Sequence, residues 1–268
     1  MATPARQVTE QLFLEELEIY RQEVAQCAQY LYAYLSIHAL SANDNIRRGL
    51  NEEALFWNTM LGSLQTSIFI SLGRVFDANN LHGPVALARM LRAAQALFSR
   101  ASLEARKRPV FGDKVNELQE YLDGTNIPAE REFRRFERLA RGYTEQFNST
   151  AYRELRSKVF AHKVYTRNEQ VTELFSQTNI DDLQRMVSFL YRFHTAVREA
   201  YDNGTCLRLS RARRSVHEML ENPRGHALVK PVAEEITEST RRVLGSIALS
   251  NPVAAAAAAR PPRTPPGN

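Results

Sequence analysis

The chain has 268 residues, of which 44% are hydrophobic and 24% charged, so it is long enough and apolar enough to bury a sizeable core. No apolar run approaches the ~20 residues that span a bilayer, and the first residues lack the apolar stretch of a secretory signal, so we expect a cytoplasmic protein without membrane contact. Cys27 and Cys206 have no metal-ligand neighbours at usable spacing, which fits a reducing compartment.

The net charge of +5 is concentrated at the carboxyl-terminal end. Residues 203–268 hold ten lysines and arginines against five acids, whereas residues 1–202 hold 25 of each sign. Such a basic segment predicts either an anionic partner such as RNA or simply a solvated terminus.

Apolar residues recur with the period of a helix along the whole chain, and no long segment alternates as a strand does. A first helix is predicted over Thr9–His38, with Thr9 as its cap, and polar residues 41–45 end it. A second helix is predicted to start at a cap on Asn51 and to run to Val75, where the turn formers at 77–80 stop it.

The middle of the chain predicts shorter helices. Gly83-Pro84 opens one over 85–98, because proline suits the first turn of a helix. Residues 99–127 are expected to form short helices that are broken at three positions, namely Pro109, Gly112 and Gly124.

Two more long helical segments follow. One is predicted over 129–165 with a bend at 148–150, where short polar side chains compete for backbone hydrogen bonds. The other is predicted over 179–204, from a cap on Asn179 to a left-handed stop at Asn203-Gly204. Four long helices joined by short connections predict an all-α, up-and-down helical bundle.

The predicted organisation has three parts. Residues 6–205 are expected to form the bundle, and residues 206–250 a basic helical extension with helices near 210–221 and 232–249. The last part, 251–268, is rich in alanine and proline and is expected to be disordered.

The most distinctive stretch is LRSKVFAHK, residues 155–163, which places Arg156 and His162 on one predicted helix. Arginine holds a phosphate in a planar fork of donors, and histidine transfers protons near neutral pH. His162 also falls on an apolar stripe with Tyr152 and Leu155, and a lone histidine in such a place is more often a core residue. The six-residue spacing separates Arg156 from His162 by about 120° on one straight helix. A two-fold dimer would bring two copies of each residue to one cleft.

This run resembles the Arg-x(4–6)-His motif of the HEPN superfamily, and its amino-acid sequence is most similar to the abortive-infection U-type branch. The strings ISLGRVFD and DDLQRMVSFLYRFHTAVREAYDNG also resemble that branch, so the resemblance covers residues 10–205. It implies a helical bundle, a homodimer, and metal-independent RNA cleavage in which Arg156 and His162 are catalytic. Ser157 stands where active members usually carry Asn, Asp or His, although serine still donates and accepts a hydrogen bond.

The leading hypothesis is a metal-independent endoribonuclease of a phage-defence (abortive-infection) or toxin–antitoxin system. It would cleave RNA by 2′-hydroxyl attack and leave a 2′,3′-cyclic phosphate. No carboxylate cluster, His-x-His pair or cysteine set predicts a metal site, and we expect no cofactor. The alternative is a non-catalytic HEPN-like helical module that binds RNA or a partner protein. A DNA-binding regulator built on 207–247 lacks the glycine pattern of a helix-turn-helix.

The expected partners are RNA, a second copy of the chain, and an antitoxin or another defence-system protein. Four basic residues near the motif or at the end of the second helix are candidate RNA contacts. For each of the three near the motif, taken singly, a solvated helix face is an equally good explanation. Arg74 and Asp77 also suit a structural pair at the helix end. The four candidates are Arg153, Lys158, Lys163 and Arg74.

Overall fold

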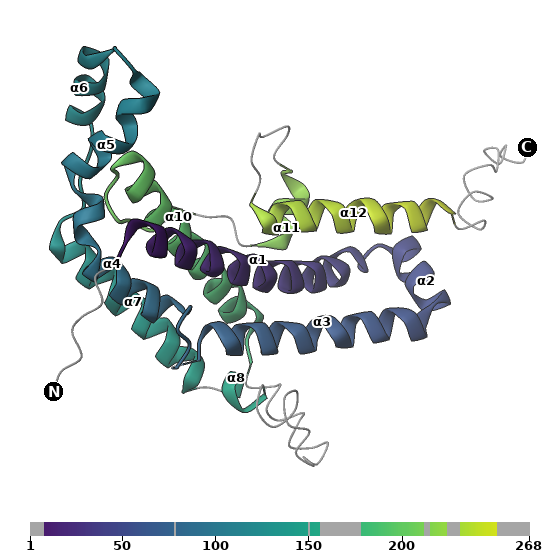
Figure 1. Cartoon of the computed structure of the whole chain (residues 1–268). Helices are drawn as coiled ribbons and strands as arrows, with labels where there is room; N and C mark the ends of the chain where they lie inside the picture. The colour runs from purple at the N-terminus through teal and green to yellow at the C-terminus, as the bar shows by residue number, and fades with distance from the viewer. Residues whose placement is uncertain are drawn as a thin grey trace, which may run out of the picture. The chain divides into compact units, whose positions relative to one another are not determined.

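The computed structural model describes residues 8–77, 79–149, 151–155, 178–211, 215–223 and 231–250 (Figure 1). Within these ranges every regular element is a helix and none is a strand, which confirms the predicted all-α fold. The helices fall into two compact units, which we describe separately. The first unit comprises Met1–Cys27 and Ile68–Ala212, and the second comprises Ala28–Ser67 and Arg213–Asn268.

The first unit holds most of the helices. It takes the amino-terminal part of α1 (Glu10–Leu40) and the carboxyl-terminal part of α3 (Ala54–Val75). Its other elements are α4 (Pro84–Ala93), η1 (Gln95–Phe98), α5 (Arg100–Phe111), α6 (Val115–Asp123), α7 (Glu130–Asn148), α8 (Ala151–Glu154) and α10 (Ile180–Asn203).

The ends of the long helices follow the capping residues in the sequence. Thr9 Oγ1 accepts a hydrogen bond from the Leu12 amide at 3.2 Å, and the Asn179 side chain accepts one from the Asp181 amide at 2.8 Å. Gly204 ends α10 at a φ of 63°. A Cβ atom there would lie 2.5 Å from Leu103 Cδ2, so packing and backbone conformation both require glycine. The predicted limits of this helix are confirmed.

Aromatic side chains dominate the core of the first unit. Phe136 of α7 and Tyr20 of α1 both pack on Phe193 of α10, with ring centroids 5.1 and 5.9 Å apart. Phe98 packs edge-on against Phe133 at 5.5 Å. All five side chains are almost completely buried, and each such burial stabilises the fold by about 1.5–3 kcal/mol.

The second unit is built from the remaining parts of α1 and α3 with α2 (Asp44–Glu52), α11 (Val216–Glu221) and α12 (Val232–Ser250). Its core joins Ile37, Leu50 and Leu244, and Trp57 packs against them. A Cβ on Gly49 would lie 2.7 Å from Ile247 Cγ2, so this glycine permits the close approach of α2 to α12.

Three sequence-based predictions of helix limits are wrong. The single helix expected over 85–98 ends at Ala93, and the separate 3-10 helix η1 covers Gln95–Phe98. Asn51 does not start a helix, because it lies inside α2, and Asn43 caps that helix by accepting from the Asn45 and Ile46 amides. Pro109 does not interrupt a helix either, because it lies in the last turn of α5, which ends at Phe111. The predicted bend at 148–150 corresponds to the end of α7 and the start of α8.

Other predicted segments lie outside the described residues, including the end of the third long segment at 156–165 and the tail at 251–268. Among the helices that the structure describes, none is both long and apolar enough to cross a membrane.

Candidate functional site

The Arg/His motif lies between two described helices, α8 and α10. Leu155 is the last described residue before it and is completely buried. The motif residues themselves lie outside the described part of the chain, and they include Arg156, Ser157, Lys158, His162 and Lys163. The described geometry therefore concerns the two ends of the segment 156–177.

A single tyrosine ties these two ends together. The Tyr152 hydroxyl in α8 accepts a hydrogen bond from the backbone N–H of Asn179 at 3.0 Å and donates one to the backbone carbonyl oxygen of Asn179 at 3.1 Å. Burial raises the pKa of Tyr152 above its usual value, so the hydroxyl keeps its proton and remains a donor. We call this pair of contacts the Tyr152 brace. It fixes where the chain leaves α8 and where it re-enters α10.

Aromatic stacking holds the brace in place. The Tyr152 ring, only 2% exposed, stacks on Phe147 at 6.0 Å and on Phe69 at 6.4 Å. Phe147 in turn stacks on Phe76 at 5.4 Å. The side-chain amide of Asn148 donates to the Phe76 carbonyl oxygen at 2.8 Å, and this bond joins the end of α7 to the end of α3. Tyr152, close to the last described residue before the motif, is thus packed in an aromatic cluster.

Two candidate RNA contacts lie in described helices. Arg153 is exposed on α8, two residues before the described segment ends. Arg74 of α3 instead bonds to α1, where its guanidinium contacts the Glu23 carboxylate at 2.6 Å and the Gln26 side chain at 2.9 Å. Its side chain remains 51% exposed, so the interhelical ion pair leaves part of it open to solvent.

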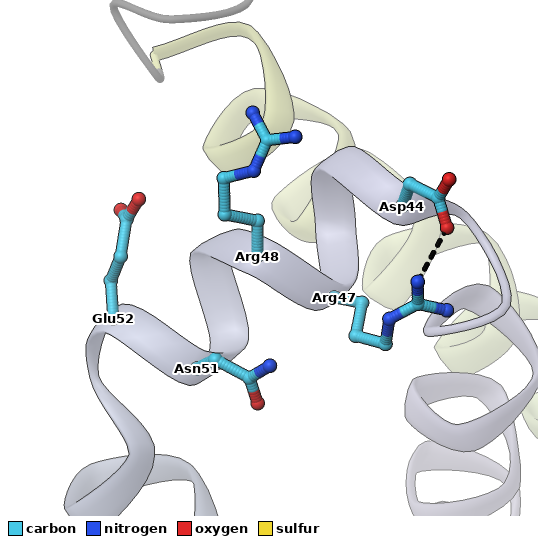
Figure 2. Close-up of a pocket in the computed structure, with 5 residues that line it drawn as sticks. All are labelled: Asp44, Arg47, Arg48, Asn51 and Glu52. Atoms are coloured by element: carbon cyan, nitrogen blue, oxygen red, sulfur yellow. Dashed lines mark hydrogen bonds and ion pairs between the residues drawn. The ribbon is translucent and has the colours of Figure 1, made fainter.

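Two polar pockets lie elsewhere on the chain. One, of about 460 Å³, is lined by residues of α2, namely Asp44, Arg47, Arg48, Asn51 and Glu52. Figure 2 shows the Arg47 side chain pointing toward Asp44, to which it bonds at 2.6 Å. Another, of about 260 Å³, lies at the start of α4, and its charged lining residues are Arg89 and Asp77. Cations and acids balance in each pocket, so neither has a net field that selects an anion. The described residues hold no cluster of three or more metal-ligating side chains.

His194 is a partly buried histidine of α10 outside the motif. Burial, followed by the charges of Arg21 and Arg198, lowers its pKa to about 4. In the unfolded chain histidine titrates near 6.5. Between pH 6.5 and 4 the unfolded chain therefore binds a proton that the folded chain does not, and stability is lost as the pH falls.

We expect the free energy of unfolding to drop by about 2 kcal/mol between pH 6.5 and 4.5 because of this group. Urea denaturation across that range measures the drop, and His194→Gln should remove most of it. An unchanged pH dependence in the variant would assign the loss to other groups.

The comparison with protein families covers the region that contains the motif. A family model described as AbiU2, of the HEPN type, matches residues 10–227. The chain belongs to the AbiU2 family of HEPN domains. The AbiU2 match runs from α1 to beyond α11 and encloses the segment that carries Arg156 and His162. It confirms the resemblance that the motif indicated. Comparisons with curated proteins and with solved structures give no match.

The Tyr152 brace of this AbiU2-type domain is not predicted by the sequence pattern. The pattern predicts only a position on an apolar stripe for Tyr152 and only a helix cap for Asn179. The available signal was a tyrosine four residues before Arg156, because a buried tyrosine needs a partner for its hydroxyl. The identity of that partner depends on tertiary packing, because Asn179 lies 27 positions further along the chain.

Proposed function

We propose that this AbiU2-type chain is a metal-independent endoribonuclease in which Arg156 and His162 act on RNA. It would serve in an abortive-infection or toxin–antitoxin system. The observation that carries the proposal is the family match over residues 10–227, which encloses both motif residues. The Tyr152 brace supports it, since a catalytic segment benefits from rigid attachment at both ends.

RNA supplies its own nucleophile, the ribose 2′-hydroxyl. In the proposed reaction a His162 imidazole removes the 2′-hydroxyl proton, a bond forms between this oxygen and phosphorus, and the bond to the 5′-oxygen breaks. The leaving oxygen takes a proton from an imidazolium. Arg156 stabilises the extra negative charge on the phosphorane with its fork of donors. Ser157 would orient its neighbours through its hydroxyl.

The proposed active form is a homodimer. One histidine in a single chain cannot act as base and acid at the same moment, and Arg156 and His162 lie about 120° apart on a straight helix. A two-fold axis through this helix would supply two histidines and two arginines to one cleft. An antitoxin or another defence-system protein is a further proposed partner.

Ser157 favours a second candidate function. A HEPN-like module without catalysis would bind RNA or a partner protein through the same surface, and a serine after the motif arginine fits that role. Product analysis separates the two candidates.

The proposed chemistry predicts defined products. RNA incubated with the protein in EDTA should yield 2′,3′-cyclic phosphate and 5′-hydroxyl ends, identified by mass spectrometry. The same oligonucleotide with 2′-O-methyl riboses should stay intact, because its nucleophile is blocked. Products with 5′-phosphate ends would contradict the mechanism, and the absence of any cleavage would favour the binding module.

A further inference from the structure

The solvent face of α7 carries an unusual run of one charge. Five arginines are exposed within about 120° of the helix circumference. The two acids within residues 131–141 are Glu132 and Glu137. We call them the arginine face. Its members are Arg131, Arg134, Arg135, Arg138 and Arg141.

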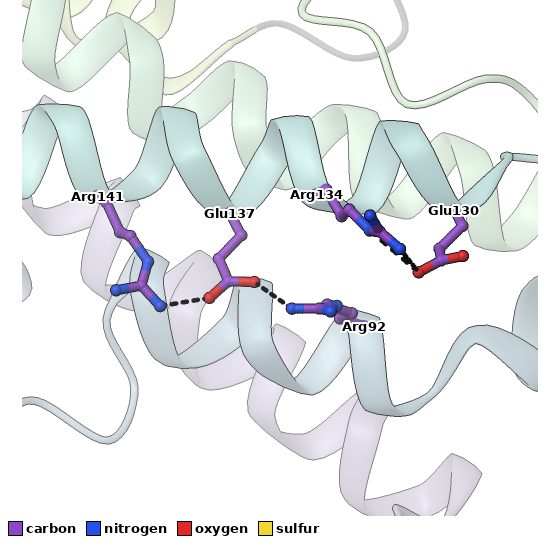
Figure 3. A network of polar contacts seen from close by, with 5 residues as sticks. All are labelled: Arg92, Glu130, Arg134, Glu137 and Arg141. Atoms are coloured by element: carbon purple, nitrogen blue, oxygen red, sulfur yellow. Dashed lines mark hydrogen bonds and ion pairs between the residues drawn. The ribbon is translucent and has the colours of Figure 1, made fainter.

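The acids of this region are already bound within the protein, as Figure 3 shows for two of them. Glu137, only 9% exposed, bridges Arg141 at 2.5 Å and Arg92 of α4 at 3.3 Å. Glu130 pairs with Arg134. The Glu132 carboxylate accepts from the Ala129 amide at 2.9 Å and so caps α7.

Three arginines remain without an acidic partner among the described residues, namely Arg131, Arg135 and Arg138. They lie three and four residues apart, so like charges are neighbours on the helix surface and weaken it slightly. Ordinary solvated helices place acids at these spacings instead. The arrangement costs helix stability and, within the described part of the chain, no acid offsets that cost, which points to an external anion.

We propose that the arginine face of α7 binds the phosphate backbone of single-stranded RNA and aligns it with the motif that follows. This inference rests on the proposed ribonuclease function. Arg141 lies seven residues, about 10 Å of helix rise, before the end of α7 at Asn148. Phe147 at that end stacks on Tyr152, which holds the entry to the motif segment.

The chemistry favours a phosphate chain over an acidic protein surface. Each guanidinium presents a planar fork that matches two phosphate oxygens, and a row of forks along a helix suits a ligand with regularly repeated anions. Arginine is also the residue on which unpaired bases stack. An acidic partner protein is the competing occupant, and the experiment below includes it.

The test measures RNA binding apart from cleavage. The parent protein carries His162→Ala, so that RNA is bound without being cleaved. Fluorescence anisotropy of a labelled single-stranded RNA of 20 nucleotides reports binding at several salt concentrations. The test variant adds R131Q, R135Q and R138Q. The matched control instead adds R21Q, R108Q and R198Q, three exposed arginines that pair with local acids on other helices. Both variants lose the same charge, and glutamine keeps a similar helix propensity.

We expect the test variant to bind RNA roughly tenfold or more weakly, with a salt slope shallower by about 2, because each lost phosphate contact removes about 0.7. The control variant should bind RNA with the same affinity and salt slope as the His162→Ala parent. Equal effects of the two variants, or a parent that does not bind RNA, would overturn the inference. So would displacement of RNA by polyglutamate at equal charge concentration, which would indicate an acidic protein as the ligand.

Failure of the RNA-binding inference is distinguishable from failure of the proposed ribonuclease function. Absence of cleavage by the wild type would count against the nuclease, whereas the binding assay reads the arginine face directly. Circular dichroism and the melting temperature of each variant exclude unfolding as the cause of weakened binding.

Discussion

Arg156→Ala is expected to lower the rate of RNA cleavage by about 10²–10³-fold, because the phosphorane loses its main source of charge stabilisation. Arg156→Lys should fail almost as badly, since a point charge does not reproduce the planar fork. His162→Ala should cost about 10²–10⁴-fold, the usual contribution of positioned acid–base catalysis. Ser157→Ala should have a smaller effect, and Ser157→Asn should raise activity.

Mixing wild type with His162→Ala tests the proposed dimer at the same time. In the proposed cleft the two chains each supply one histidine, so a heterodimer of wild type with His162→Ala lacks either the base or the acid. An excess of His162→Ala should therefore lower the activity of a fixed amount of wild-type chain once subunits have exchanged. Activity that stays proportional to the amount of wild-type chain after subunit exchange would place each site within one chain. If His162→Ala chiefly lowers helicity and melting temperature, the histidine is a core residue and not a catalyst.

Tyr152→Phe is expected to reduce cleavage although residue 152 never touches RNA in this account. The change removes the hydroxyl and leaves the Asn179 backbone amide without its described partner, which costs about 1–3 kcal/mol, whereas the Asn179 carbonyl oxygen still accepts from the Asp182 and Leu183 amides. The motif segment would then be held less firmly, and kcat should fall more than KM rises. Tyr152→Ala should cost about 3–5 kcal/mol, because it also leaves a cavity beside Phe147 and Phe69.

Tyr20→Phe is the matched control for the brace. Tyr20 is also fully buried, and its hydroxyl donates to the Leu190 carbonyl oxygen at 3.3 Å, but it does not flank the motif. The control should lower the melting temperature about as much as Tyr152→Phe and leave kcat unchanged. Equal kcat values in the two variants would reduce Tyr152 to a purely structural residue.

Local signals in the sequence predicted most of the helices. Thr9, Asn179 and Gly204 act within one turn of the backbone, so their effects are readable without tertiary structure. The choice between Asn43 and Asn51 was different, because both are competent caps. Asn43 prevails since the helix it starts buries Leu50 against Leu244 of α12, from the other end of the chain.

The candidate site shows the same limit. The spacing of Arg156 and His162 was sufficient to indicate the HEPN resemblance, which the AbiU2 match confirms. The brace was not predictable, because it joins residues 27 positions apart. The arginine face is visible in the sequence, but its surplus charge is not, since Glu137 is shared with Arg92 of another helix.

The central claim is that Arg156 and His162 cleave RNA without a metal, and one assay tests it most directly. Wild-type protein and His162→Ala, matched in helicity and melting temperature, are incubated with the same RNA in excess EDTA. We expect the wild type to cleave the RNA to cyclic-phosphate products and the variant to lose at least about 10²-fold in rate. Equal cleavage by both proteins, or cleavage that EDTA abolishes, would contradict it.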